Sequence, residues 1–189
     1  MRKRVVILAS GQGSLAQAII DASDLEIQIV AVVSDRVDAQ VLERAKKASI
    51  NTSVVTLTAD RQHWNKQLFE TVDQYSPDLV VSAGFMRILS PEFVNYFPTI
   101  NSHPALLPDF PGAHAVRDAL DSGVEVTGST VHWVDEGIDT GAIIQQQEVA
   151  VLPEDDEASL HERIKIVERA LIVETLQRFI ADGIPRRNQ

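Results

Sequence analysis

The sequence predicts an α/β fold: a Rossmann-like, twisted, mostly parallel sheet with helices on both faces, followed by a C-terminal strand pair and a long helix. Up to about residue 100, short β-branched runs alternate with stretches of helical periodicity, as in successive βαβ units. Toward the C-terminus, two runs of alternating character precede a long amphipathic stretch. A chain of 189 residues can bury one two-sided sheet core, so residues 1–189 are expected to form a single domain.

Composition and charge exclude several classes of function. The net charge of -10 argues against a nucleic-acid partner or an anionic membrane surface, because both require a basic footprint. The chain has no Cys, which excludes disulfides, a thiolate nucleophile and a Cys-based metal site. No stretch approaches the roughly 20 apolar residues of a membrane span. We therefore expect a cytoplasmic protein.

The first strand and helix are predicted on either side of a glycine loop, which we define as residues 10–14. Residues 4–9 form an uninterrupted β-branched run, typical of a strand buried on both faces. Helical spacing begins at Ser14, which is placed to cap the helix. When a strand, a glycine loop and a helix follow one another, the backbone N–H groups of the loop and of the helix N-terminus are oriented to bind a phosphate. A tight turn that needs glycine for its backbone angles explains the same residues.

The following elements continue the alternation. We predict strands at 27–34, 52–57 and 78–84, and helices at 39–48 and 61–75. In parallel sheets, ligands bind outside the carboxyl ends of the strands. The glycine loop, residues 86–89 and residues 100–114 all fall at such ends, so we expect them to converge on one crevice.

Residues 100–114 hold Pro104, Pro108 and Pro111, which fix φ and remove amide donors. We therefore expect a stiff loop that is neither a helix nor a central strand; the isomer of the Leu107–Pro108 bond is left open. Asn101 and His103 are two residues apart, so both lie on one face if a strand precedes the loop. They bring an amide donor beside a group that titrates near neutrality.

The C-terminal part is predicted to hold a short helix, a hairpin and a long helix. The helix at 113–122 ends before a glycine, and strands at 126–134 and 142–151 flank a turn with three acids. Residues 156–181 read as a long amphipathic helix, and residues 186–189 as a frayed basic tail. The apolar stripe of the long helix comprises Leu160, Ile164, Val167 and Leu171.

Of the five histidines, His103 is the strongest catalytic candidate, because the prolines hold its surroundings in place. His63 and His161 lie among charged neighbours and are expected on the surface. For His132, packing and a role at the crevice remain equally open, and His114 either starts a helix or supports the site.

A catalytic histidine needs a carboxylate partner, and the turn between the last two strands offers Asp135, Glu136 and Asp139. Spacing does not choose among them, and solvated loop acids are the alternative. Asn, His and a carboxylate without a Ser or Cys nucleophile suit a substrate that brings its own nucleophile. The chemistry indicated is acyl transfer or hydrolysis on a phosphorylated small molecule. No ligand spacing such as His-x-x-x-His occurs, so no metal is expected.

Four segments, residues 10–14, 83–90, 100–108 and 131–141, closely resemble the phosphoribosylglycinamide formyltransferase family of folate-dependent purine-synthesis enzymes. The resemblance extends from the first strand to the last helix. It implies transfer of a formyl group from the co-substrate 10-formyltetrahydrofolate to the amine of glycinamide ribonucleotide. It also implies that Asn101 and protonated His103 stabilise the tetrahedral oxyanion, while Asp139 raises the pKa of His103 and assists proton transfer.

The resemblance also implies binding residues for both small-molecule substrates. On the folate side they are Arg61, Met86, Arg87, Ile88, Leu89 and Asn101. On the ribonucleotide side, Gly11, Gln12, Gly13 and Ser14 hold the phosphate and Glu168 contacts the ribose. The sequence departs from the family at Leu15, where the family often carries Asn. Because Leu has no polar group, backbone amides alone are expected to bind the phosphate.

Two alternatives remain. A formyltetrahydrofolate hydrolase shares the catalytic group and uses water in place of the amine, but such relatives carry an extra N-terminal domain, whereas the first strand here begins at residue 4. A non-catalytic domain that binds a phosphorylated ligand needs the glycine loop alone and gives no reason for His103. The oligomeric state is open, a homodimer included.

Overall fold

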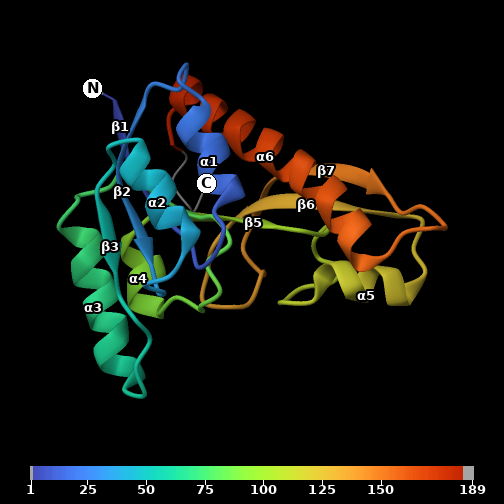
Figure 1. Ribbon diagram of the computed structural model, residues 1–189, viewed down its shortest axis with the longest axis horizontal. Helices are drawn as coiled ribbons and strands as arrows, with labels where there is room; N and C mark the ends of the chain where they lie inside the picture. Colours follow the sequence, from blue (N-terminus) through green and yellow to red (C-terminus); the bar gives the residue numbers. More distant parts are fainter. Residues whose placement is uncertain (1, 185–189) are drawn as a thin grey trace.

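The computed structural model describes residues 2–184, and its centre is a seven-stranded sheet with the order β3-β2-β1-β4-β5-β6-β7 (Figure 1). Neighbouring strands from β3 to β5 run parallel, whereas β6 is antiparallel to β5 and to β7. This confirms the predicted α/β, Rossmann-like architecture. The strands are β1 Lys3–Leu8, β2 Ile27–Ser34, β3 Thr52–Val54, β4 Leu79–Ser82, β5 Thr99–His103, β6 Val126–Trp133 and β7 Ile143–Ala150.

Helices cover both faces of the sheet because the central strands are apolar on both sides. In β1, Val5 and Ile7 belong to one hydrophobic cluster, and Val6 and Leu8 to the other. The first cluster is covered by α1 Ser14–Asp21, α2 Gln40–Lys47 and α6 Glu157–Asp182. The second is covered by α3 Arg61–Asp73 and α4 Pro91–Tyr96. Helix α5 Ala115–Ser122 packs against α6 in a third, smaller cluster that also includes Val149 of β7 (Figure 1).

Most elements lie where the sequence predicts them, with differences of one or two residues at their ends. Strand β3 is shorter than expected, because only Thr52–Val54 pairs with β2. Helix α4 is an element that the sequence reading did not predict, although its start carries a clear signal. Ser90 is the N-cap, its side chain accepts a hydrogen bond from the Phe93 amide, and Pro91 occupies the first turn.

Two predictions at the ends of elements are wrong. Ser14 does not cap α1: the N-cap is Gly13, with φ 74°, and Ser14 is the first helical residue. Residues 100–103 are not loop, because β5 runs from Thr99 to His103 as an interior strand between β4 and β6. The prolines restrict the chain only after His103, and the Leu107–Pro108 bond beyond it is cis.

The C-terminal hairpin and long helix form as predicted. Strands β6 and β7 pair in antiparallel fashion, and α6 begins at a capping box in which Asp156 and Ser159 bond each other's backbone. Leu160, Ile164 and Leu171 are buried, and Val167 is partly buried against them. The predicted frayed tail at 186–189 lies outside the described residues. No helix within residues 2–184 is long and apolar enough to cross a membrane.

Candidate active site

The site lies at the carboxyl end of β5, where β6 runs alongside it. The register pairs Asn101 with His132 and His103 with Thr130, so these four side chains share one face of the sheet. A cavity of about 380 Å³ opens there. It is lined by residues 84–89, by the end of β5, by Gly112 and Ala113, and by the loop after β6. The expected convergence of residues 86–89 with the end of β5 is therefore present.

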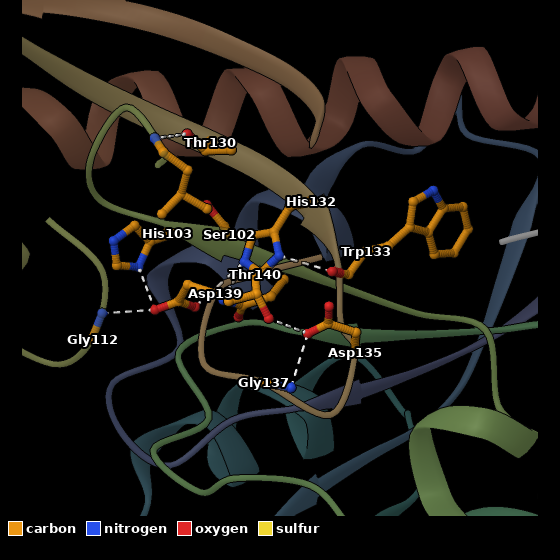
Figure 2. Close-up of polar contacts among 12 residues, drawn as sticks. Ser102, His103, Gly112, Thr130, His132, Trp133, Asp135, Gly137, Asp139 and Thr140 are labelled. Carbon is orange, nitrogen blue, oxygen red and sulfur yellow. Dashed lines mark hydrogen bonds and ion pairs between the residues drawn. The ribbon is translucent and has the colours of Figure 1, made fainter. Parts of the chain in front are cut away.

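His103 is buried and both of its ring nitrogens face acceptors. Its Nε2 lies 2.8 Å from the carbonyl oxygen of Phe110, and its Nδ1 lies 3.4 Å from Oδ2 of Asp139 (Figure 2). A carbonyl only accepts, so Nε2 carries a proton. Burial lowers the pKa of His103, and the Asp139 carboxylate and the Phe110 carbonyl offset this only in part. The expectation of a raised pKa for His103 is wrong, because the side chain is only 4% exposed.

Asp139 lies between two histidines. One oxygen accepts a hydrogen bond of 2.8 Å from the Gly112 amide, and the other lies 3.5 Å from Nε2 of His132. Burial acts to raise the pKa of Asp139, but the contacts with His132 and Gly112 and the charge of His103 outweigh it and lower the pKa. The carboxylate is therefore ionised at neutral pH. Its backbone has φ 54°, in the left-handed region.

The three acids of the loop after β6 have separate partners. Asp139 faces the histidines, whereas Asp135 accepts hydrogen bonds from Gly137 and Thr140, and Glu136 accepts one from Asn95. Sequence spacing left these acids equivalent. In the structure, Asp139 alone of the three pairs with His103.

His132 is the site residue that sequence reasoning left undecided. Its Nδ1 donates to the Trp133 carbonyl at 2.9 Å (Figure 2). Its Nε2 lies 3.2 Å from the Asn101 amide nitrogen and 3.5 Å from the Asp139 carboxylate, so Nε2 accepts from Asn101 when it carries no proton and donates to Asp139 when it does. One N–H of the Asn101 side chain is thereby fixed and the second stays available. Only the register between β5 and β6 reveals this pairing, and a single sequence does not specify the register.

The glycine loop turns its carbonyls toward α2. The Gly11 carbonyl accepts from the Val41 amide at 3.1 Å, and the Gln12 carbonyl accepts from the Arg44 side chain at 2.8 Å. The amides of Gly11, Gln12 and Gly13 make no hydrogen bond within residues 2–184, so they are available to an anion.

Glu168, on α6, lies on the other face of β5 from His103. It accepts a hydrogen bond of 2.9 Å from the Ser102 hydroxyl, and its own burial raises its pKa. Because Ser102 stands between Asn101 and His103, one strand presents residues to both faces of the sheet.

Three hydrogen bonds hold residues 86–89 in place. The Met86 amide donates to the Ser10 hydroxyl at 2.9 Å, Nε of Arg87 bonds the fully buried carboxylate of Asp35 at 2.6 Å, and Arg61 donates to the Ile88 carbonyl. Leu89 is buried, whereas Met86 and Ile88 project outward. Arg61 also stacks over Trp64, with 4.4 Å to the ring centroid, and it does not line the cavity.

The other three histidines do not line the cavity. His63 is exposed on α3, and His114 is exposed at the start of α5. His161 is half-buried, contrary to the expectation of a surface position. In residues 2–184, no group of three or more His, Cys, Asp or Glu side chains is arranged to hold a metal ion.

A Rossmann-like sheet with an amide, two histidines and an ionised carboxylate at its carboxyl edge suits a group-transfer enzyme whose substrate supplies the nucleophile. Residues 3–176 match the family model described as formyl transferase, and the chain belongs to that family. It is thus a folate-dependent formyltransferase, as its motifs predicted.

Two relatives are named phosphoribosylglycinamide formyltransferase. The chain is 49% identical to phosphoribosylglycinamide formyltransferase of Mycobacterium tuberculosis over 187 residues, covering 96% of this chain and 86% of the relative. It is 41% identical to the Escherichia coli enzyme of the same name, covering 95% of this chain and 87% of that one. The solved structure of glycinamide ribonucleotide transformylase 1 from Symbiobacterium toebii superposes with a TM-score of 0.92 at 38% identity, over 96% of this chain and 89% of that chain.

Proposed function

We propose that residues 1–189 act as one cytoplasmic formyltransferase domain, which moves the formyl group of 10-formyltetrahydrofolate to the amine of 5'-phosphoribosylglycinamide in purine biosynthesis. The observation that carries the proposal is the contact between His103 and Asp139, at 3.4 Å on the wall of a cavity that also holds Asn101. The names of the relatives supply the substrate, and the site supplies the chemistry.

In the proposed reaction, the amine nitrogen attacks the formyl carbon, a C–N bond forms and the carbonyl oxygen becomes an oxyanion. The N–H of Asn101 that does not face His132 donates to this oxygen, and protonated His103 supplies positive charge beside it. When the bond from the formyl carbon to N10 breaks, N10 takes a proton and the amine loses one. Because burial lowers the pKa of His103, its imidazolium is a stronger acid, which suits proton donation to N10.

Asp139 has two tasks in this scheme. Its charge partly offsets the burial that lowers the pKa of His103, so a larger fraction of His103 is protonated than burial alone would allow. Its second oxygen, 3.5 Å from Nε2 of His132, would take part in moving the proton between the two amines.

The two substrates would bind from different elements. Residues 86–89, fastened by Arg61 and by Arg87 with Asp35, would offer backbone groups to the pterin. The unpaired amides of the glycine loop would hold the phosphate, and the Glu168 carboxylate would accept from the ribose. Leu15 is buried and offers no polar group, so backbone amides carry the phosphate.

The test is a rate measurement of tetrahydrofolate release from 10-formyltetrahydrofolate, with and without the ribonucleotide. We expect tetrahydrofolate to be released only when the amine is present. The amount of formylated ribonucleotide should equal the amount of tetrahydrofolate released. His103→Ala should lower kcat by about 10²–10⁴-fold with the fold intact, whereas His63→Gln, at an exposed histidine that does not line the cavity, should not. Release without the amine would identify a hydrolase, and near-normal turnover of His103→Ala would refute the mechanism.

A further inference from the structure

The loop that follows β6 contains a hydrogen-bonded brace separate from the contacts of Asp139. A single oxygen of Asp135 accepts from the Thr140 hydroxyl at 2.7 Å and from the Gly137 amide at 3.0 Å (Figure 2). Asp135 begins the loop and Thr140 directly follows Asp139. The brace therefore closes the loop across the residue that faces the histidines.

The backbone of the loop is shaped for this closure. A Cβ placed on Gly137 would lie 2.1 Å from the Thr140 hydroxyl oxygen, so the hydroxyl occupies the space that a side chain would need. A Cβ on Gly141 would lie 1.7 Å from the Trp133 carbonyl oxygen. Below the loop, the Trp133 amide donates to the Ala142 carbonyl at 2.9 Å. The glycines let the two ends of the loop approach closely, and Thr140 fills the gap that they leave.

Asp139 needs such support. Its φ of 54° is uncommon for a residue other than glycine and is unfavourable for an isolated chain. Its contacts with His103 and His132, at 3.4 and 3.5 Å, are too long to hold the loop by themselves. The only bond of ordinary length that its carboxylate makes in the described residues is the one from the Gly112 amide.

We propose that Asp135 and Thr140 are positioning residues for the formyl transfer reaction: their hydrogen bond holds Asp139 in the left-handed conformation that directs its carboxylate to His103 and His132. The inference rests on the proposed function, because it assigns the brace to the same catalytic group. It gives Asp135 a role separate from that of Asp139, the acid that pairs with His103.

The experiment compares four variants. Thr140→Val removes the hydroxyl and keeps the branched shape, and Asp135→Ala removes the acceptor. Thr140→Ser and Asp135→Asn keep the hydrogen bond and are the matched controls. We expect the first pair to lower kcat about 10-fold with KM changed less than about 3-fold, since a carboxylate displaced by an ångström costs rate rather than affinity. The control pair should retain most of the activity, and all four should melt within about 2 °C of the wild type because the bond is exposed.

Two further readouts separate positioning from a merely structural role. Loss of the Asp139 partner lowers the pKa of His103 further, so the His103 ring signal in an NMR titration should move to lower pH in Thr140→Val. The Gly112 amide, which donates to Asp139, should exchange its hydrogen faster. In the double variant Asp135→Ala with Thr140→Val, kcat should fall no further than in Asp135→Ala alone, because both substitutions remove the same hydrogen bond.

The outcomes are distinct. The proposal would be refuted if Thr140→Val and Asp135→Ala kept the wild-type kcat. It would also be refuted if the losses of kcat from the two substitutions added in the double variant. If the wild type itself transferred no formyl group, the proposed function would fail, and the NMR titration and the Gly112 exchange would still decide the brace. An unchanged His103 titration in Thr140→Val would then reject it.

Discussion

His103 illustrates how opposing influences set the chemistry of one residue. The resemblance to known formyltransferases places a carboxylate beside it, and that charge alone raises its pKa. The ring is also almost wholly buried, and burial outweighs the nearby charge, so the pKa of His103 falls below its ordinary value. Motifs identify which groups meet, but how much protein surrounds them depends on the packed structure.

Asp139→Asn tests this balance. In the proposed mechanism formyl transfer needs protonated His103, so activity should fall as the pH rises through the lowered pKa of His103. The Asp139 charge acts to raise this pKa, so its removal should move the alkaline limb of the kcat–pH profile to lower pH, and kcat should drop about 10²–10⁴-fold. Glu136→Gln removes a charge from the same loop without touching either histidine and should leave the profile in place. A profile of Asp139→Asn that matches the wild type would exclude Asp139 as the partner of His103.

At the scale of elements, the sequence predicted well where the pattern is continuous and poorly where a few residues decide. The apolar run of β1 and the long periodicity of α6 were placed within one or two residues, because burial on both faces or along one stripe leaves a repeating signature. Strand β5 is longer than the sequence predicts, because the prolines restrict the backbone only after His103. Helix α4 has only six residues, too few to show a period.

The glycine loop offers a prediction at this scale, because α2 packs directly on it. A Cβ on Gly13 would lie 2.4 Å from Cγ2 of Val41, and its φ of 74° is unfavourable for alanine. Gly13→Ala should therefore lower the free energy of unfolding by about 2–5 kcal/mol, measured by urea denaturation. Gly11→Ala is the matched control: its Cβ would meet no atom within 4 Å, so its stability should stay within about 0.5 kcal/mol of the wild type.

The steric part of this cost can be separated from the backbone part. Val41→Ala makes room for the new methyl group, so the cost of Gly13→Ala with Val41→Ala should be smaller than the sum of the two single costs. Full additivity would show that Val41 is not the obstacle. An equal loss of stability in Gly11→Ala would show that the loop needs both glycines for a reason other than this contact.

For the whole molecule, the sheet joins two groups of residues that lie far apart in the sequence and to which the proposed function assigns the two substrates. The glycine loop and Glu168 belong to the face covered by α1 and α6, whereas Asn101, His103 and His132 point to the other face. Strand β5 connects them, because its alternation sends Ser102 to one side and its neighbours to the other. The convergence of residues 86–89 with the end of β5 was predictable from the order of elements, whereas the glycine loop, expected in the same crevice, does not line the cavity. The pairing of His132 with Asn101 was not predictable, because it depends on the antiparallel register of β6.

The stability of the whole chain should depend on pH through histidines outside the site as well as within it. His161 is half-buried on α6, and burial, aided by Lys165, lowers its pKa in the folded state. Between that pKa and the unfolded value near 6.5, the unfolded chain binds more protons, so stability should rise with pH across this window. Below the folded pKa both states are protonated, and the contribution is lost. His103 acts in the same sense, whereas the raised pKa of Glu168 acts against it.

His161→Gln isolates one of these contributions without altering the cavity. The urea midpoint of the wild type and the variant should be compared between pH 5.5 and 7.5, a range chosen to bracket the unfolded histidine pKa of about 6.5. The wild type should gain stability relative to the variant as the pH rises, by no more than about 1.4 kcal/mol per pH unit, the limit for one proton. This gain should level off above the window. Two parallel curves would mean that His161 titrates alike in both states and that its burial on α6 carries no pH-dependent cost.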